Sequence, residues 1–213
     1  MKLLAAFASV FPLIFSVERR DVGISIKDDS YPADFRPNFD SSFSVSIQEP
    51  LATAFHVLGT NSKLCELILL SPIASDCQLG ILDSVNVDGP LEDAFARTAP
   101  AAPAGQGFPR QHFSYIETVK IIPGLSFLDI VVHLNGTYTW DQERRITLYE
   151  SSPDTSITVR KVCTFEPLNN GAATNVSEVV HGQCPILQQP IVQFGARKVH
   201  RAQMSLYHTL FGI

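Results

Sequence analysis

Apolar and polar residues alternate with a period of two along much of the chain, the pattern typical of half-buried β-strands. The first such segment starts at Phe43, where Phe43, Val45 and Ile47 alternate with serines and a glutamine. Six further segments have strand-like patterns, at residues 79–87, 111–122, 127–140, 145–151, 156–165 and 174–183. Short turns containing Pro, Gly and Asn separate several of them, which favours antiparallel pairing.

Helical patterns precede and follow this series of strands. Two short helices are predicted directly after the first strand, at residues 50–58 and 63–70. A long helix is predicted from Pro190 to Phe211, because Pro190 suits a first helical turn and apolar residues recur at helical spacing. The predicted stripe is Ile191, Val192, Gly195, Val199, Ala202, Leu206 and Leu210. Such a stripe must be buried, so the long helix is expected to lie across a curved sheet and to leave a cavity beneath it.

The N-terminal 42 residues differ from the rest. Residues 1–17 combine one lysine with an apolar run and resemble a signal peptide or a short anchor, but Ile14 makes a poor cleavage site. Residues 18–42 are polar and form a loosely ordered lead-in to a domain spanning 43–213. The weak cleavage site favours a cytoplasmic protein. The competing interpretation is a secreted or membrane-tethered protein with glycans at Asn135 and Asn175, which fit the acceptor pattern.

Composition adds further constraints. The chain has 213 residues, 45% of them hydrophobic, so it can build a sizeable core. The net charge of −5 and the lack of a basic run argue against nucleic acid as a partner. The four cysteines show no zinc spacing, and we interpret them as buried free thiols, with disulfides as the alternative. The histidines show no metal-ligand spacing, although His56 and His112 are expected near the cavity ends.

Charged residues occur on the faces of the strands that are otherwise apolar. Alternation assigns Glu117, Glu150, Lys161 and Glu178 to the inner face of the sheet. A buried carboxylate must be paired or shifted in pKa, so each is either a structural ion pair or a candidate acid–base group. The aromatic residues Tyr115, Tyr138 and Trp140 are expected to line the same space, either as cavity wall or as core.

Three stretches carry a resemblance to a known superfamily: Glu49–Pro72, Gly136–Ser151 and Ala196–Phe211. Together with the order of the elements, they resemble the START-like (SRPBCC) superfamily, and within it the fungal polyene-pyrone cyclases. The resemblance implies an α+β helix-grip fold: a seven-stranded antiparallel sheet around a long C-terminal helix, with two short helices after the first strand.

The resemblance also implies a function at the expected cavity. One hypothesis is a cofactor-independent polyketide cyclase that forms a pyrone by lactonisation in a fungal secondary-metabolite pathway. Glu117 and Glu150 are then the catalytic candidates, and Tyr115, Tyr138, Trp140 and Lys161 the substrate-binding ones, with no metal. The alternative is a carrier that binds a lipid or polyketide without chemistry. Either hypothesis takes a hydrophobic small molecule as partner, and the chain contains no nucleotide-binding glycine motif or serine-hydrolase motif.

Overall fold

A single antiparallel sheet curves around one long helix. The computed structural model describes residues 35–103, 105–119, 130–153 and 157–212. The seven strands are β1 (Phe39–Ile47), β2 (Ala74–Val85), β3 (Phe108–Val119), β4 (Ile130–Asp141), β5 (Ile146–Pro153), β6 (Thr158–Leu168) and β7 (Ala173–Gln183). Their order in the sheet is β1-β7-β6-β5-β4-β3-β2, and every neighbouring pair is antiparallel. The expected fold class is therefore confirmed, with the first strand starting at Phe39 rather than Phe43.

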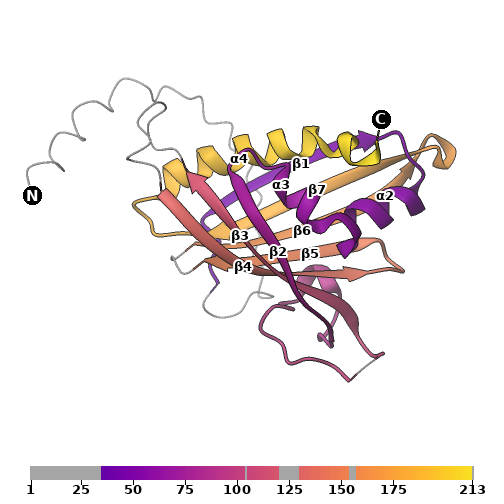
Figure 1. Cartoon of the computed structure of the whole chain (residues 1–213), viewed down its shortest axis with the longest axis horizontal. Helices are drawn as coiled ribbons and strands as arrows, with labels where there is room; N and C mark the ends of the chain where they lie inside the picture. The colour runs from indigo at the N-terminus through magenta and orange to yellow at the C-terminus, as the bar shows by residue number, and fades with distance from the viewer. Residues whose placement is uncertain (1–34, 104, 120–129, 154–156, 213) are drawn as a thin grey trace, which may run out of the picture.

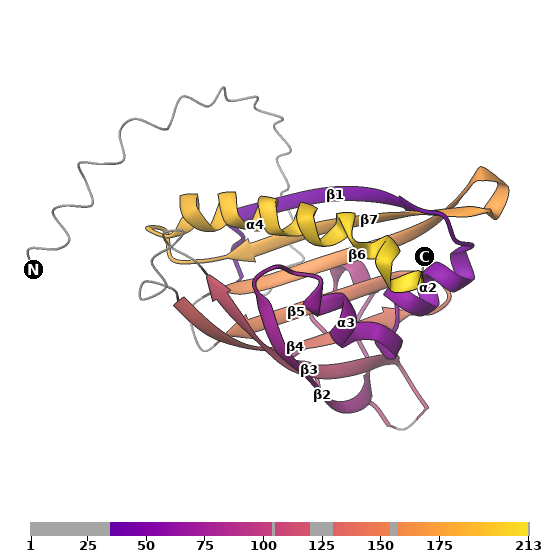
Figure 2. The same ribbon diagram turned by 45° about the horizontal axis from the view of Figure 1, so that its top comes forward.

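The helices lie together on the concave side of the sheet. Two of them, α2 (Leu51–Leu58) and α3 (Leu64–Leu69), follow β1 as predicted, and α4 (Gln189–Ser205) follows β7. Figures 1 and 2 show α4 along β1 and β7, with α2 and α3 on the same side of the sheet. A 3₁₀ turn, η5 (Tyr207–Phe211), ends the helical segment that was expected to be one continuous helix. The concave face of the sheet is thus covered by helices that lie far apart in the sequence.

The buried face of α4 differs from the predicted stripe. His200 and Met204 on α4, and Tyr207 and Leu210 on η5, are buried, whereas Ile191 is 60% exposed. His200 lies outside the predicted stripe, yet both of its ring nitrogens have partners in the interior. A buried polar group with its hydrogen bonds made carries little penalty.

The convex face of the sheet is covered as well, by the connection between β2 and β3. Leu91 and Ala96 of this connection pack with Val85 and Leu148 in a second, smaller core. The Pro- and Ala-rich segment that follows packs on this face too, through Ala99. The C-terminal half of β4 and the first six residues of β5 are consequently buried on both faces.

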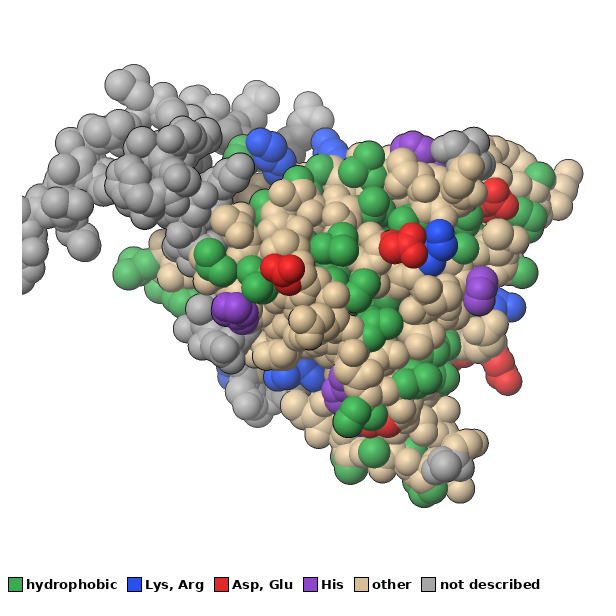
Figure 3. Space-filling model, in the orientation of Figure 1, with side chains coloured by type: hydrophobic (Ala, Val, Ile, Leu, Met, Phe, Trp, Pro, Cys, Tyr) green, Lys and Arg blue, Asp and Glu red, His purple; other side chains and the backbone are tan. Residues whose placement is uncertain are grey.

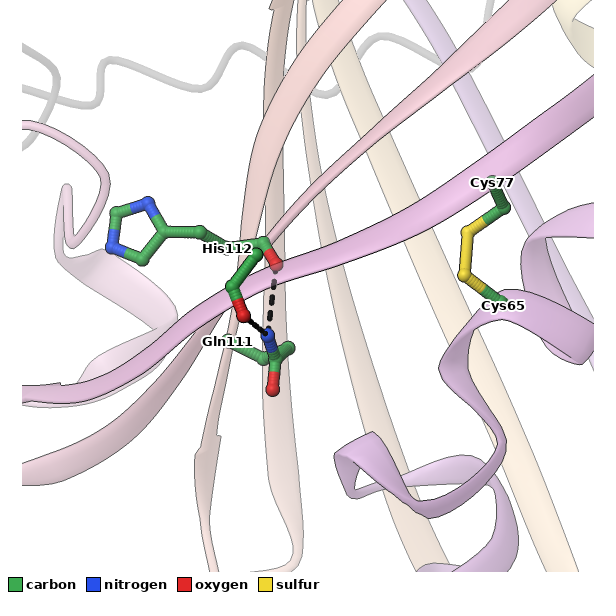
Figure 4. The surroundings of a disulfide bond; sticks show 5 residues. Cys65, Cys77, Gln111 and His112 are labelled. Atoms are coloured by element: carbon green, nitrogen blue, oxygen red, sulfur yellow. Dashed lines mark hydrogen bonds between the residues drawn. A yellow bond between two sulfur atoms is a disulfide. The ribbon is translucent and has the colours of Figure 1, made fainter.

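A disulfide links Cys65 on α3 to Cys77 on β2, and the other two cysteines are free and buried. Figure 4 shows the bond between the helix and the strand. The interpretation of all four cysteines as free thiols is thus wrong for this pair. Sequence spacing could not reveal the pairing, because the two cysteines meet only when α3 folds back against β2.

We expect removal of this bond to destabilise the protein by about 2–4 kcal/mol, because the crosslink restricts the unfolded chain. The measurement is urea unfolding of the wild-type chain with and without reductant. The Cys65→Ser/Cys77→Ser variant is the control, since reductant should not change its stability. An unchanged wild-type midpoint after verified reduction would contradict the assignment.

No helix within the described ranges is both long and apolar enough to cross a lipid bilayer. The segment predicted as signal or anchor, residues 1–17, lies outside the described residues.

Candidate functional site

A line of polar side chains crosses the concave face of the sheet beneath α4. It includes Glu117 and Tyr115 from β3, Tyr149 from β5, Lys161 from β6 and Glu178 from β7. The strand register brings them to one face, because Tyr149 is opposite Lys161 and Cys163 is opposite Glu178. Three further groups join from outside the central strands: Ser41 from β1, His200 from α4 and Tyr207 from η5.

One half of the line is centred on Glu178. Its Oε2 lies 3.1 Å from Lys161 Nζ and 3.1 Å from His200 Nε2. Its Oε1 accepts a 2.6 Å hydrogen bond from the Tyr207 hydroxyl. His200 Nδ1 in turn lies 2.8 Å from Ser41 Oγ. The Glu178 carboxylate is therefore fully engaged, and it ties α4 and η5 to the sheet.

The electrostatic environment keeps Glu178 ionised. Burial alone would raise its pKa, but the positive charge of Lys161 and the hydrogen bonds from His200 and Tyr207 outweigh burial and hold the pKa at about 2. A carboxylate this stabilised is a weak base. This half of the line is suited to holding structure and to placing Lys161.

The other half of the line joins Glu117 to two tyrosines. The Tyr115 and Tyr149 hydroxyl oxygens lie 2.7 Å apart, and the Tyr115 hydroxyl donates a longer bond of 3.3 Å to Glu117 Oε1. Lys161 Nζ lies 5.3 Å from the centre of the Tyr149 ring, within cation–π range. The two halves therefore meet at Tyr149 and Lys161.

Glu117 has the properties expected of a general base. Burial raises its pKa above the ordinary value, and the hydrogen bond from Tyr115 only partly opposes this effect. Burial also raises the pKa of Tyr115 and of Tyr149, so both phenols stay protonated and can donate. Tyr115 and Tyr149 are buried, whereas Glu117 and Lys161 keep partial exposure. Glu117 and Lys161 are thus the groups of this half that reach toward solvent.

Of the four predicted binding residues, Tyr115 and Lys161 belong to this line, whereas Tyr138 and Trp140 belong to the core. Tyr138 and Trp140 lie on the concave face as predicted, with ring centres 6.4 Å apart. The Tyr138 hydroxyl donates a 2.6 Å bond to the Leu58 carbonyl, which links β4 to α2. Both side chains are less than a tenth exposed and belong to the main core. Tyr138 therefore holds α2 against the sheet through this hydrogen bond.

Glu150 lies on the wrong side of the sheet for the predicted role. Its strand partner is Arg160, and its Oε2 accepts hydrogen bonds of 2.9 and 2.8 Å from the backbone N–H groups of Ala96 and Arg97. The prediction failed because Ile146 and Leu148 share this face of β5 and are buried as well, Leu148 against the segment that covers the convex face. Burial raises the pKa of Glu150, while the Arg97 N–H bond and the charge of Arg160 lower it. Glu150 fixes the covering segment and has no access to the concave face.

Sequence reasoning missed Tyr149, His200 and Tyr207. Tyr149 alternates with Thr147 and Ser151, so its side of β5 looked polar and solvent-facing. His200, Met204 and Tyr207 do recur at helical spacing, and this spacing was the available signal for a buried face. The described residues contain no group of three His, Cys, Asp or Glu side chains placed to hold a metal ion.

The surface above the helices shows few charges. In Figure 3, which has the orientation of Figure 1, Lys, Arg, Asp and Glu side chains are scattered among apolar and neutral ones. The Glu117 to Glu178 line, in contrast, is a cluster of interacting ionisable side chains on the concave side of the described sheet.

Comparisons with known proteins concern the fold. No protein-family model matches the chain, and no curated protein matches it. A solved structure from Thermus thermophilus is similar over 80% of this chain and 95% of its own, with 13% identity and a TM-score of 0.52. The Zhui aromatase/cyclase from a Streptomyces species is similar over 80% of this chain and 87% of its own, with 11% identity and a TM-score of 0.46. A START superfamily protein from Mycobacterium smegmatis is similar over 80% of this chain and 94% of its own, with 9% identity and a TM-score of 0.40. Sheet order, helix placement and the first of these likenesses together give the chain a helix-grip fold.

Proposed function

We propose that the chain is a cofactor-independent cyclase that lactonises a polyketide-like chain at the Glu117 end of the concave face. The observation that carries the proposal is the Glu117–Tyr115–Tyr149 line, which combines a base of raised pKa with protonated phenols on an otherwise apolar face. One of the fold neighbours is named an aromatase/cyclase, and that activity belongs to that protein.

The reaction assigns a role to each group. Glu117 takes the proton from an enol hydroxyl of a 1,3-dicarbonyl unit, and the enol oxygen attacks the thioester carbonyl at the chain end. The new C–O bond converts this carbonyl to an oxyanion, which Lys161 or the Tyr149 hydroxyl stabilises. Collapse of the oxyanion breaks the C–S bond, and the thiolate leaves with the proton that Glu117 carries. The products are a pyrone and a thiol.

Positioning contributes in addition to proton transfer. Intramolecular reactions between well-oriented groups gain up to about 7–11 kcal/mol over their unoriented counterparts. In this proposal the partly exposed Glu117 and Lys161 hold the reacting end of the chain in that orientation. A fungal secondary-metabolite pathway is the setting we propose, since such pathways supply polyene chains with 1,3-dicarbonyl ends.

The test is to incubate the purified full-length chain with a linear polyene 1,3-dicarbonyl thioester and to follow pyrone and free thiol by mass spectrometry. We expect pyrone formation well above the spontaneous rate. Tight binding of the thioester without any acceleration would instead identify a carrier and would overturn the cyclase proposal.

A further inference from the structure

The Asn135-Gly136-Thr137 tripeptide lies on β4, and its Asn135 side chain is on the convex face, away from the proposed cyclase site. Asn135 is exposed, and β3 residue Ser114 is its strand partner. Beside it is a hollow of about 500 Å³, whose lining includes Gln78, Leu79, His112, Ser114 and Thr137. Figure 4 shows the His112 side chain pointing away from the Cys65–Cys77 bond, as expected for a residue on this face. The tripeptide thus combines an accessible amide with open space next to it.

The lining of this hollow is suited to a sugar. His112, Ser114 and Gln78 present polar side chains for hydroxyl and acetamide groups, and Leu79 presents an apolar surface that is 47% exposed. Thr137 is 1% exposed, and its Oγ1 has no hydrogen-bond partner among the described residues. Buried hydroxyls normally have a partner, so this one is unusual.

The disulfide supplies an independent observation. Bonds of this kind form and persist in oxidising compartments and are rare in the cytosol. The Cys65–Cys77 bond therefore favours passage of the chain through a secretory compartment, where N-glycosylation takes place. The bond therefore supports the competing interpretation of a secreted or membrane-tethered protein over the cytoplasmic one.

The second acceptor tripeptide, at Asn175, has a different environment. Asn175 is half-buried on β7, and its Nδ2 donates a 3.0 Å hydrogen bond to Ser177 Oγ. Ser177 Oγ also lies 2.8 Å from Ser44 Oγ on β1, so the amide belongs to a hydrogen-bonded cluster between two strands. A sugar on Asn175 would disrupt this cluster, whereas a sugar on the exposed Asn135 amide would extend into the open hollow.

We propose that Asn135 carries an N-linked glycan whose first N-acetylglucosamine occupies the hollow beside β2, and that Asn175 stays unmodified. In the transfer, Asn135 Nδ2 forms a bond to the anomeric carbon of a lipid-diphosphate-linked oligosaccharide. The bond from that carbon to the phosphate oxygen breaks, the lipid diphosphate leaves with the electron pair, and the amide nitrogen loses one proton.

The glycan would also protect the edge of the sheet. β2 is an edge strand with irregular pairing to β3, and it exposes Leu79, Ile81 (74%) and Leu82 (56%). Exposed apolar edge strands promote association between sheets, and proteins commonly block them. A bulky, solvated sugar next to Leu79 and Gly80 would provide such a block.

The experiment uses the full chain, including residues 1–34, expressed through the secretory pathway of a eukaryotic host. Wild type and four variants are treated with peptide N-glycosidase, and the mobility shift and peptide masses are measured. The variants are N135Q, T137V, T137S and N175Q. T137V erases the acceptor pattern but removes a hydroxyl that makes no hydrogen bond to the described residues, so folding should be preserved. T137S keeps the acceptor pattern and is its matched control.

We expect one glycan on wild type, T137S and N175Q, and none on N135Q and T137V, with deamidation by the glycosidase at residue 135. The glycan-free variants should aggregate sooner than T137S on concentration. Absence of a shift in wild type, a shift that persists in T137V, or deamidation at residue 175 would each overturn the proposal.

Discussion

Glu178→Gln is expected to destabilise the protein by about 3–5 kcal/mol, the cost of removing one partner from a buried ion pair. The substitution leaves Lys161, which is only 14% exposed, without its carboxylate partner. It also weakens the bonds that hold His200 and Tyr207, and with them α4 and η5, against the sheet. Urea unfolding measures this loss.

Glu166→Gln on the exposed side of β6 is the matched control and should change stability by less than about 0.5 kcal/mol. The Lys161→Met/Glu178→Met double variant should lose less than the sum of its single variants, because no charge is left unpaired. A loss below about 1 kcal/mol for Glu178→Gln would contradict the account of this cluster, since a broken buried ion pair costs more than that.

The same cluster predicts a dependence on pH. The folded-state pKa of Glu178 is about 2, below the ordinary value of 4.5, so its contribution to stability is present above pH 4.5 and is lost as pH falls toward 2. Wild-type stability should therefore decrease over this window more steeply than that of Glu178→Gln. Parallel curves for the two proteins would contradict the assignment.

Glu117→Gln should reduce cyclase turnover by about 10²–10⁴-fold, the usual contribution of a positioned general base. The amide cannot accept the enol proton, yet it can still accept the hydrogen bond from Tyr115. The raised pKa of Glu117 adds a second expectation: wild-type kcat/KM should rise with pH through a value above 4.5, and this limb should be absent in the variant.

Glu150→Gln is the control for this experiment, because Glu150 is a buried glutamate on the other face of the same sheet. It should keep turnover near the wild-type level while it loosens the segment at Ala96 and Arg97. If Glu117→Gln and Glu150→Gln reduce turnover equally, the assignment of Glu117 as base is wrong.

The sequence predicted more of the fold than of the site. Alternation identified the strands, and on β3, β6 and β7 it placed Glu117, Lys161 and Glu178 on the correct face, because only one face of those strands is predominantly apolar. On β5 it failed, since the β2–β3 connection packs on Leu148 and buries the convex face, so that the apolar residues there look like the inner set. A covering segment of this kind cannot be recognised from the periodicity of the strand that it covers.

The interactions at the site depend on contacts between distant segments. His200 comes next to Glu178 and Ser41 only through the rotation of α4 on the sheet, which differs from the rotation that the apolar stripe predicts. The Cys65–Cys77 bond likewise depends on how α3 turns back to β2. Sequence spacing identifies such residues one at a time, while their partners are set by tertiary packing.

Titration of the tyrosine-labelled protein with a non-cyclisable ether analogue of the polyene thioester, followed by NMR, tests the central claim most directly. We expect saturable shifts of the Tyr115 and Tyr149 ring signals, and contacts from the analogue's dicarbonyl end to Tyr149 but not to the His112 ring in the convex-face hollow. Contacts at His112 with unperturbed Tyr115 and Tyr149, or no saturable shift at any tyrosine, would contradict a concave-face site.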